Sequence, residues 1–183
     1  LFKTEMDNLA LYGYGVKGFM LSMIETAIRI TGGHLSAEGT QQILEIGKEL
    51  LDRPIEILPH VEHVLEVLST KYRLVVATKG DLLDQERKLK KSGLAKYFHH
   101  IEIMSDKQPA DYQKLIRHLD VAPEQFLMIG NSLKSDVLPV LDLGGHAVHI
   151  PFHTTWAHEI VSHPVVHPNF REIEELDEIL AFL

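Results

Sequence analysis

The chain has 183 residues, a formal net charge of −8, a hydrophobic content of 45% and no cysteine. The lack of cysteine excludes a disulfide framework and a thiol nucleophile, and the negative charge argues against a nucleic-acid-binding surface, which would be basic. No apolar stretch has the length of a membrane span and no signal-peptide pattern occurs, so we expect a cytoplasmic protein that binds no membrane.

The first 57 residues are predicted to be entirely helical. Apolar residues from Met20 to Ile28 recur at helical spacing, and Thr31-Gly32-Gly33 is a plausible helix stop. A second apolar stripe runs from Ile43 to Leu51, and no alternating β pattern occurs before residue 72. We expect residues 1–57 to form one domain of about four helices.

Residues 58–183 are predicted to form an α/β domain. Leu58-Pro59-His60 marks its beginning, because proline is well tolerated at the start of a helix, and the helix that follows runs to about Lys71. Strands and helices then alternate, which indicates a doubly wound parallel sheet with helices on both faces. The predicted strands lie near 73–78, 100–104, 126–130 and 146–150, and the predicted helices near 81–92, 109–119, 133–143 and 173–182.

Polar side chains follow three of these apolar strands. They are Thr78, Lys107 and the segment Gly130-Asn131-Ser132-Leu133-Lys134-Ser135-Asp136. In an open α/β sheet, ligands bind outside the carboxyl ends of the strands. A hydroxyl, an ammonium and an amide/carboxylate pair at one edge suit a phosphate held together with a divalent metal.

Thr78, Lys79 and Gly80 are the predicted phosphate-binding residues after the first strand. The Thr78 hydroxyl can donate to a phosphate oxygen, and the amides of Lys79 and Gly80 are expected at a helix N-terminus, where donors and dipole favour an anion. Gly80 permits a sharp turn and close approach of a ligand. The alternative is that Thr78 only caps the helix.

Lys107, Asn131 and Asp136 complete the predicted site. The Lys107 ammonium would offset charge on a transferring phosphoryl group, unless it is an ordinary surface lysine. The oxygens of Asn131 and Asp136 suit Mg²⁺, and either could be the direct ligand. Asp136 could instead only stabilise the dipole of the helix in which it lies.

These motifs resemble those of the haloacid dehalogenase (HAD) superfamily with a helical cap. Thr78-Lys79-Gly80-Asp81 resembles the second family motif, Lys107-Gln108-Pro109 the third, and Gly130 to Asp136 the fourth. The resemblance implies a HAD-like Rossmannoid core at 58–183 and a cap at 1–57. It also implies a Mg²⁺-dependent phosphatase that acts on a small phosphorylated metabolite through an aspartyl-phosphate.

The first family motif, Asp-x-Asp-x-Thr, does not occur in these residues. The acidic residues nearest the start, Glu5 and Asp7, lie in a helix-like stretch. We therefore expect the nucleophilic aspartate upstream of Leu1, on a central strand between those that end at Thr78 and Gly130, and residues 1–183 alone to be inactive. The alternatives are a non-catalytic HAD-like binding or structural protein, and a dehalogenase or phosphomutase of the same superfamily. Asp136 favours phosphate, because carbon–halogen cleavage needs no metal.

Two further features have less specific interpretations. The chain has 12 histidines, but His146 and His149 would face opposite sides of a strand and no zinc-protease spacing occurs. The stretch from Pro151 to Glu159 contains the only tryptophan, Trp156. It either packs in the core under the cap or faces the substrate. The basic run from Arg87 to Lys91 is expected to be a solvated helix face.

Overall fold

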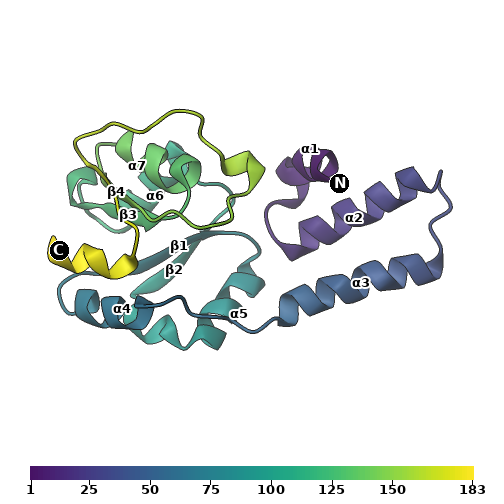
Figure 1. The fold of residues 1–183 in the computed structure, drawn as a ribbon, viewed down its shortest axis with the longest axis horizontal. Coiled ribbons are helices and arrows are strands. Elements are labelled where there is room, and N and C mark those ends of the chain that lie inside the picture. The colour runs from purple at the N-terminus through teal and green to yellow at the C-terminus, as the bar shows by residue number, and fades with distance from the viewer. The chain divides into compact units, whose positions relative to one another are not determined.

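The computed structural model describes residues 1–183, which form two compact units (Figure 1). The first comprises Leu1–Ile57 and Val75–Ser105, and the second comprises Leu58–Leu74 and Asp106–Leu183. The first unit contains α1 (Phe2–Tyr12), α2 (Val16–Ile30), α3 (Ala37–Asp52), β1 (Val75–Lys79), α5 (Leu82–Ser92), η1 (Leu94–Tyr97) and β2 (His100–Met104). The second contains α4 (Val61–Ser69), α6 (Pro109–His118), η2 (Pro123–Gln125), β3 (Leu127–Gly130), η3 (Leu133–Val137), α7 (Leu138–Leu141), β4 (His146–His149), η4 (Ala157–Glu159), β5 (Phe170–Glu172) and η5 (Leu176–Ala181).

Residues 1–57 contain helices and no strand, as predicted, although there are three helices rather than about four. Helices α1 and α2 join through polar side chains: the Asn8 amide donates to Ser22 at 3.2 Å and to Glu25 at 3.0 Å. Helices α2 and α3 approach closely at Gly47, where a Cβ atom would lie 1.9 Å from the Met20 sulfur. No helix of the protein has both the length and the apolar character that crossing a membrane requires.

The sheet of the first unit consists of β1 and β2, which pair in parallel from Val75–His100 to Lys79–Met104. Helix α5 connects them. Asp81 caps its N-terminus by accepting a hydrogen bond from the Asp84 amide at 3.2 Å, and Gly93 ends it with a φ of 72°. The strand–helix–strand order agrees with the predicted parallel sheet.

The sheet of the second unit has the order β3-β4-β5, and all its strands are parallel. Neighbouring residues of β4 point to opposite faces. Val148 packs with α4 and η5 residues, including Val64 and Ile179, whereas Ala147 packs with Val137 and Leu141. Helices therefore cover both faces of this sheet, which confirms the doubly wound α/β fold.

The end of the chain differs from the prediction in two places. The helix expected over 133–143 is divided into a π-helical turn, η3, and the short α7. The helix expected over 173–182 is only the shorter 3-10 helix η5, and strand β5, which was not predicted, lies just before it. Pro139 explains the first difference, because it lacks the N–H that would continue regular α-helical bonding back to Ser135.

The strands lie in two separate sheets rather than one. Strand β1 belongs to a two-stranded sheet, and β3 lies at the edge of its three-stranded sheet.

Candidate active site

A buried ion pair at the end of β3 joins Lys107 and Asp136. The Lys107 ammonium donates to Asp136 Oδ1 at 2.5 Å, and the two residues are 8% and 5% exposed. The other carboxylate oxygen, Oδ2, accepts from the Ser132 amide at 3.0 Å. The structure thus brings together two of the predicted site residues, which lie 29 positions apart in the sequence.

Gly130 permits this arrangement. A Cβ atom at this position would lie 2.2 Å from Asp136 Oδ2, so only glycine leaves room for the carboxylate beside the end of β3. Ser132 then begins the π-helical turn: its carbonyl accepts from the amides of Asp136 and Val137 at 2.8 and 3.2 Å. The extra residue in the turn directs the Asp136 side chain back towards the strand end.

A buried histidine holds the other end of the same loop. His149, on β4, lies with Nε2 3.2 Å from the Asn131 carbonyl oxygen and Nδ1 2.7 Å from Glu172. The Asn131 backbone is thereby fixed, while its side chain is exposed. The amide of Asn131 is therefore accessible to a ligand.

Tyr112 stabilises the loop around Asp136 through a buried hydrogen bond. Its side chain is fully buried, and its hydroxyl donates to the Ser135 carbonyl oxygen at 3.0 Å. This is the carbonyl that Pro139 cannot satisfy. Burial raises the pKa of the Tyr112 hydroxyl far above its ordinary value, and the charges of Asp136 and Glu159 raise it further. The hydroxyl therefore remains protonated and keeps donating.

Thr78, Lys79 and Gly80 belong to the first unit. The Thr78 hydroxyl lies at the end of β1 and donates to the side-chain oxygen of Gln85 at 3.1 Å. Gly80 has a φ of 137°, and a Cβ there would lie 2.8 Å from the Gln85 amide nitrogen. The backbone amides of Lys79 and Gly80 were predicted to lie at a helix N-terminus, and this is wrong. Lys79 ends β1, Gly80 precedes the N-cap residue, and α5 begins only at Leu82.

The turn between α1 and α2 contacts the segment between β1 and α5. Tyr14 lies between Gly13 and Gly15, which have φ values of 68° and 120°. The Lys79 ammonium lies 4.1 Å from the centre of the Tyr14 ring, and Lys17 forms a 2.9 Å ion pair with Asp81. The Lys17 hydrogen bond lowers the pKa of the Asp81 carboxyl.

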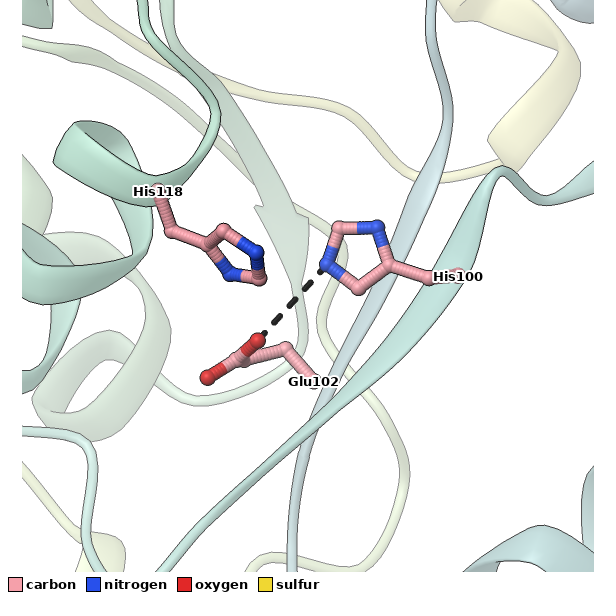
Figure 2. Close-up of side chains that lie close together, drawn as sticks. All are labelled: His100, Glu102 and His118. Atoms are coloured by element: carbon pink, nitrogen blue, oxygen red, sulfur yellow. Dashed lines mark ion pairs between the residues drawn. The ribbon is translucent and has the colours of Figure 1, made fainter.

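Two histidines outside the loop, His60 and His100, lie near carboxylates. Figure 2 shows the His100 ring directed at the Glu102 carboxylate on the same face of β2, with 3.6 Å between Nε2 and Oε2. In the second unit, the two nitrogens of His60 lie 3.5 and 3.7 Å from carboxylate oxygens of Glu175 and Asp177.

The donors around Asp136 are compatible with part of a Mg²⁺ coordination shell. Magnesium takes oxygen ligands, usually one or two carboxylates with waters and phosphate oxygens. Asp136 provides a carboxylate and Asn131 an exposed amide oxygen. Lys107 offsets the charge of Asp136, so further negative ligands are needed for a high affinity.

Sequence reasoning missed several groups that shape the site: His149 and Glu172, Tyr14 and Lys17, and Glu159, which accepts hydrogen bonds from two serines of the loop. The only sequence signal was Gly13-Tyr14-Gly15, in which two glycines flank an aromatic residue. The other contacts depend on the pairing of β3, β4 and β5.

Parallel α/β sheets with polar groups at the strand ends define a Rossmann-like enzyme fold. The chain belongs to the haloacid dehalogenase-like hydrolases, because the model of that family matches residues 3–143. A haloacid dehalogenase-like family hydrolase from Xanthomonas campestris is 39% identical, with a TM-score of 0.85, over 95% of this chain and 70% of that protein.

More distant structures share the fold. A predicted phosphoglycolate phosphatase from Haemophilus somnus is 20% identical, with a TM-score of 0.59, over 75% of this chain and 65% of that one. A 2-haloacid dehalogenase from Pseudomonas syringae pv. tomato is also 20% identical, with a TM-score of 0.61, over 98% of this chain and 79% of that one. No curated protein sequence matches.

Proposed function

We propose that this hydrolase is a Mg²⁺-dependent phosphatase that acts on a small phosphorylated metabolite. The observation that carries the proposal is the buried Lys107–Asp136 pair at the end of β3. A carboxylate and an ammonium held 2.5 Å apart at the end of β3, the strand that the exposed Asn131 follows directly, suit a metal and a phosphate better than a neutral substrate.

The proposed reaction requires a nucleophilic aspartate upstream of Leu1. Strand β3 lies at the edge of its sheet, so it can pair with a further strand that carries this aspartate. Its carboxylate would attack phosphorus to form an aspartyl-phosphate, while the bond to the leaving oxygen breaks and a second acidic residue protonates that oxygen. Water would then hydrolyse the aspartyl-phosphate and release inorganic phosphate.

The residues of this chain have separate roles in that proposal. Asp136 and Asn131 would hold the metal, which when bound offsets charge on the transferring phosphoryl group. Lys107 would hold the Asp136 carboxylate in place and add positive charge near the phosphoryl group. Thr78 would donate its hydroxyl to a phosphate oxygen.

Dehalogenation is a second candidate, favoured by one observation. Asn131 provides a neutral amide rather than a carboxylate, which weakens any metal site. The two candidates predict different products. The protein with its upstream segment is assayed for phosphate release from a panel of phosphomonoesters, and for halide release from 2-haloacids, with Mg²⁺ or with EDTA.

Phosphate release that requires Mg²⁺ supports the proposal. Halide release that is insensitive to EDTA assigns the second candidate instead. If neither product forms on a broad panel, the protein is a non-catalytic member of the family. A Lys107→Ala variant, once shown to fold, tests whether any activity observed depends on the buried pair.

A further inference from the structure

The carboxylate of Glu159 is bonded to the loop that carries Asp136. Glu159 lies in η4, beyond the end of β4. Its Oε2 atom accepts a hydrogen bond from the Ser135 hydroxyl at 2.5 Å and another from the Ser132 hydroxyl. Both serines are buried and Glu159 is half-buried, so the two bonds are partly buried.

The two serines connect Glu159 with Asp136. The Ser132 hydroxyl oxygen accepts from the Ser135 amide at 3.0 Å, and the Ser132 amide donates to Asp136 Oδ2 at 3.0 Å. Because the Ser132 hydroxyl accepts from this amide, its own proton is free to go to Glu159. One carboxylate oxygen thus fixes both hydroxyls of the turn that orients Asp136.

Lys134 ties the same segment to the loop a second time. Its ammonium donates to the carbonyl oxygen of His158 at 2.8 Å. The segment around Glu159 is therefore bonded to the first turn of η3 through a carboxylate and through a backbone carbonyl. Neighbouring Trp156, the only tryptophan of the chain, lies three residues before Glu159.

We propose that Glu159 is a positioning residue for Asp136. It holds Ser132 and Ser135 so that the Ser132 amide and the Lys107 ammonium together direct the Asp136 carboxylate. This inference rests on the proposed function, in which Asp136 holds the metal. Hydrogen-bond partners of metal ligands are worth about 10- to 100-fold in metal affinity in other proteins.

The test compares Glu159→Ala and Glu159→Gln with Glu124→Gln, a control at an exposed glutamate on η2. The first measurement is amide hydrogen exchange over residues 131–137 without metal. The second is the Mg²⁺ dissociation constant, from calorimetry and from the fluorescence of Trp156. Both use the protein with its upstream segment.

Glu159→Ala is expected to speed exchange over residues 131–137 about tenfold and to raise the Mg²⁺ dissociation constant about tenfold or more. Glu159→Gln, which keeps an acceptor oxygen, is expected to lie between this variant and the wild type. Glu124→Gln should match the wild type in both measurements.

Ser135→Ala provides a milder variant if Glu159→Ala does not fold. It should reproduce part of the loss, and the effects of the two substitutions should not add. Unchanged exchange in both variants would overturn the proposal. So would an unchanged Mg²⁺ affinity in a protein that binds Mg²⁺, since Glu159 would then only stabilise the loop. If the wild type binds no Mg²⁺, the proposed function fails, and the exchange measurement alone decides whether Glu159 holds the loop.

Discussion

Lys107 and Asp136 form a buried ion pair that joins the segment before α6 to the π-helical turn after β3. The pair is a 2.5 Å contact between residues that are each less than a tenth exposed. Removing one member of such a pair leaves the other as an uncompensated buried charge. This is far more costly than removing both.

We therefore predict that Lys107→Met destabilises the protein by about 3 kcal/mol or more. Urea unfolding measures this, and the double variant Lys107→Met/Asp136→Leu is the control. The double variant should recover much of the lost stability while remaining without activity. A Lys107→Met protein as stable as the wild type would show that Asp136 is not buried as a charge.

Tyr112→Phe is predicted to cost about 1–3 kcal/mol, because it leaves the Ser135 carbonyl without its buried donor. The matched control is Tyr72→Phe, since the Tyr72 hydroxyl donates to the Leu183 carbonyl in an exposed contact. Equal losses in the two variants, measured by denaturant unfolding, would contradict the role of Tyr112. The substitution should also impair any activity that depends on Asp136.

The acid stability of the first unit is predicted to depend on Asp84. This carboxylate is 1% exposed and forms ion pairs with Arg87 at 3.1 Å and Lys88 at 2.8 Å. Burial raises its pKa, but the two cations outweigh that effect and hold the pKa below its ordinary value of 3.8. The stabilisation is therefore present above pH 3.8 and is lost as the pH falls through the folded-state pKa.

Thermal unfolding of wild type and Asp84→Asn between pH 2 and 7 tests this prediction (roughly the range of carboxyl titration). The variant should be less stable near neutral pH and should lose less stability on acidification. Parallel curves for the two proteins would mean that the pKa of Asp84 is not shifted by folding.

Asp81 has two roles, and we predict that its role as the helix cap contributes more to the stability of the fold than its ion pair does. Its side chain caps α5 and also pairs with Lys17, whose side chain is 56% exposed. An N-cap is worth about 0.5–2 kcal/mol, whereas an exposed ion pair contributes about 1 kcal/mol at most. Asp81→Ala should therefore destabilise more than Lys17→Ala, and only the second effect should vanish at high salt. Urea unfolding at low and high salt concentration measures both.

Much of the fold and part of the site follow from local sequence patterns. Short apolar runs that end in Thr78 or Gly130 identify parallel strands, and the polar residues after them identify the site edge. That Lys107 and Asp136 lie close together was also foreseeable from the sequence, because each residue follows the carboxyl end of a strand. The π-helical turn was missed because Leu133 to Leu141 keeps a helical apolar pattern, and only Pro139 interrupts the bonding.

Contacts such as Glu159 to Ser132 and His149 to Glu172 could not be predicted. They join segments that become neighbours only after β4 pairs with β3 and β5, and no periodicity marks the loop from Pro151 to Ile160. In the structure, one end of this segment contacts the loop around Asp136, while Phe152 and His153 near its other end are exposed.

The Mg²⁺ dependence of phosphate release by wild type and Asp136→Asn, both with the upstream segment, tests the central claim most directly. We expect release by the wild type to stop with EDTA and resume with Mg²⁺. The variant should need about 10- to 100-fold more Mg²⁺ for the same rate. Phosphate release that is unaffected by EDTA, and equal in the two proteins, would contradict the assignment of Asp136.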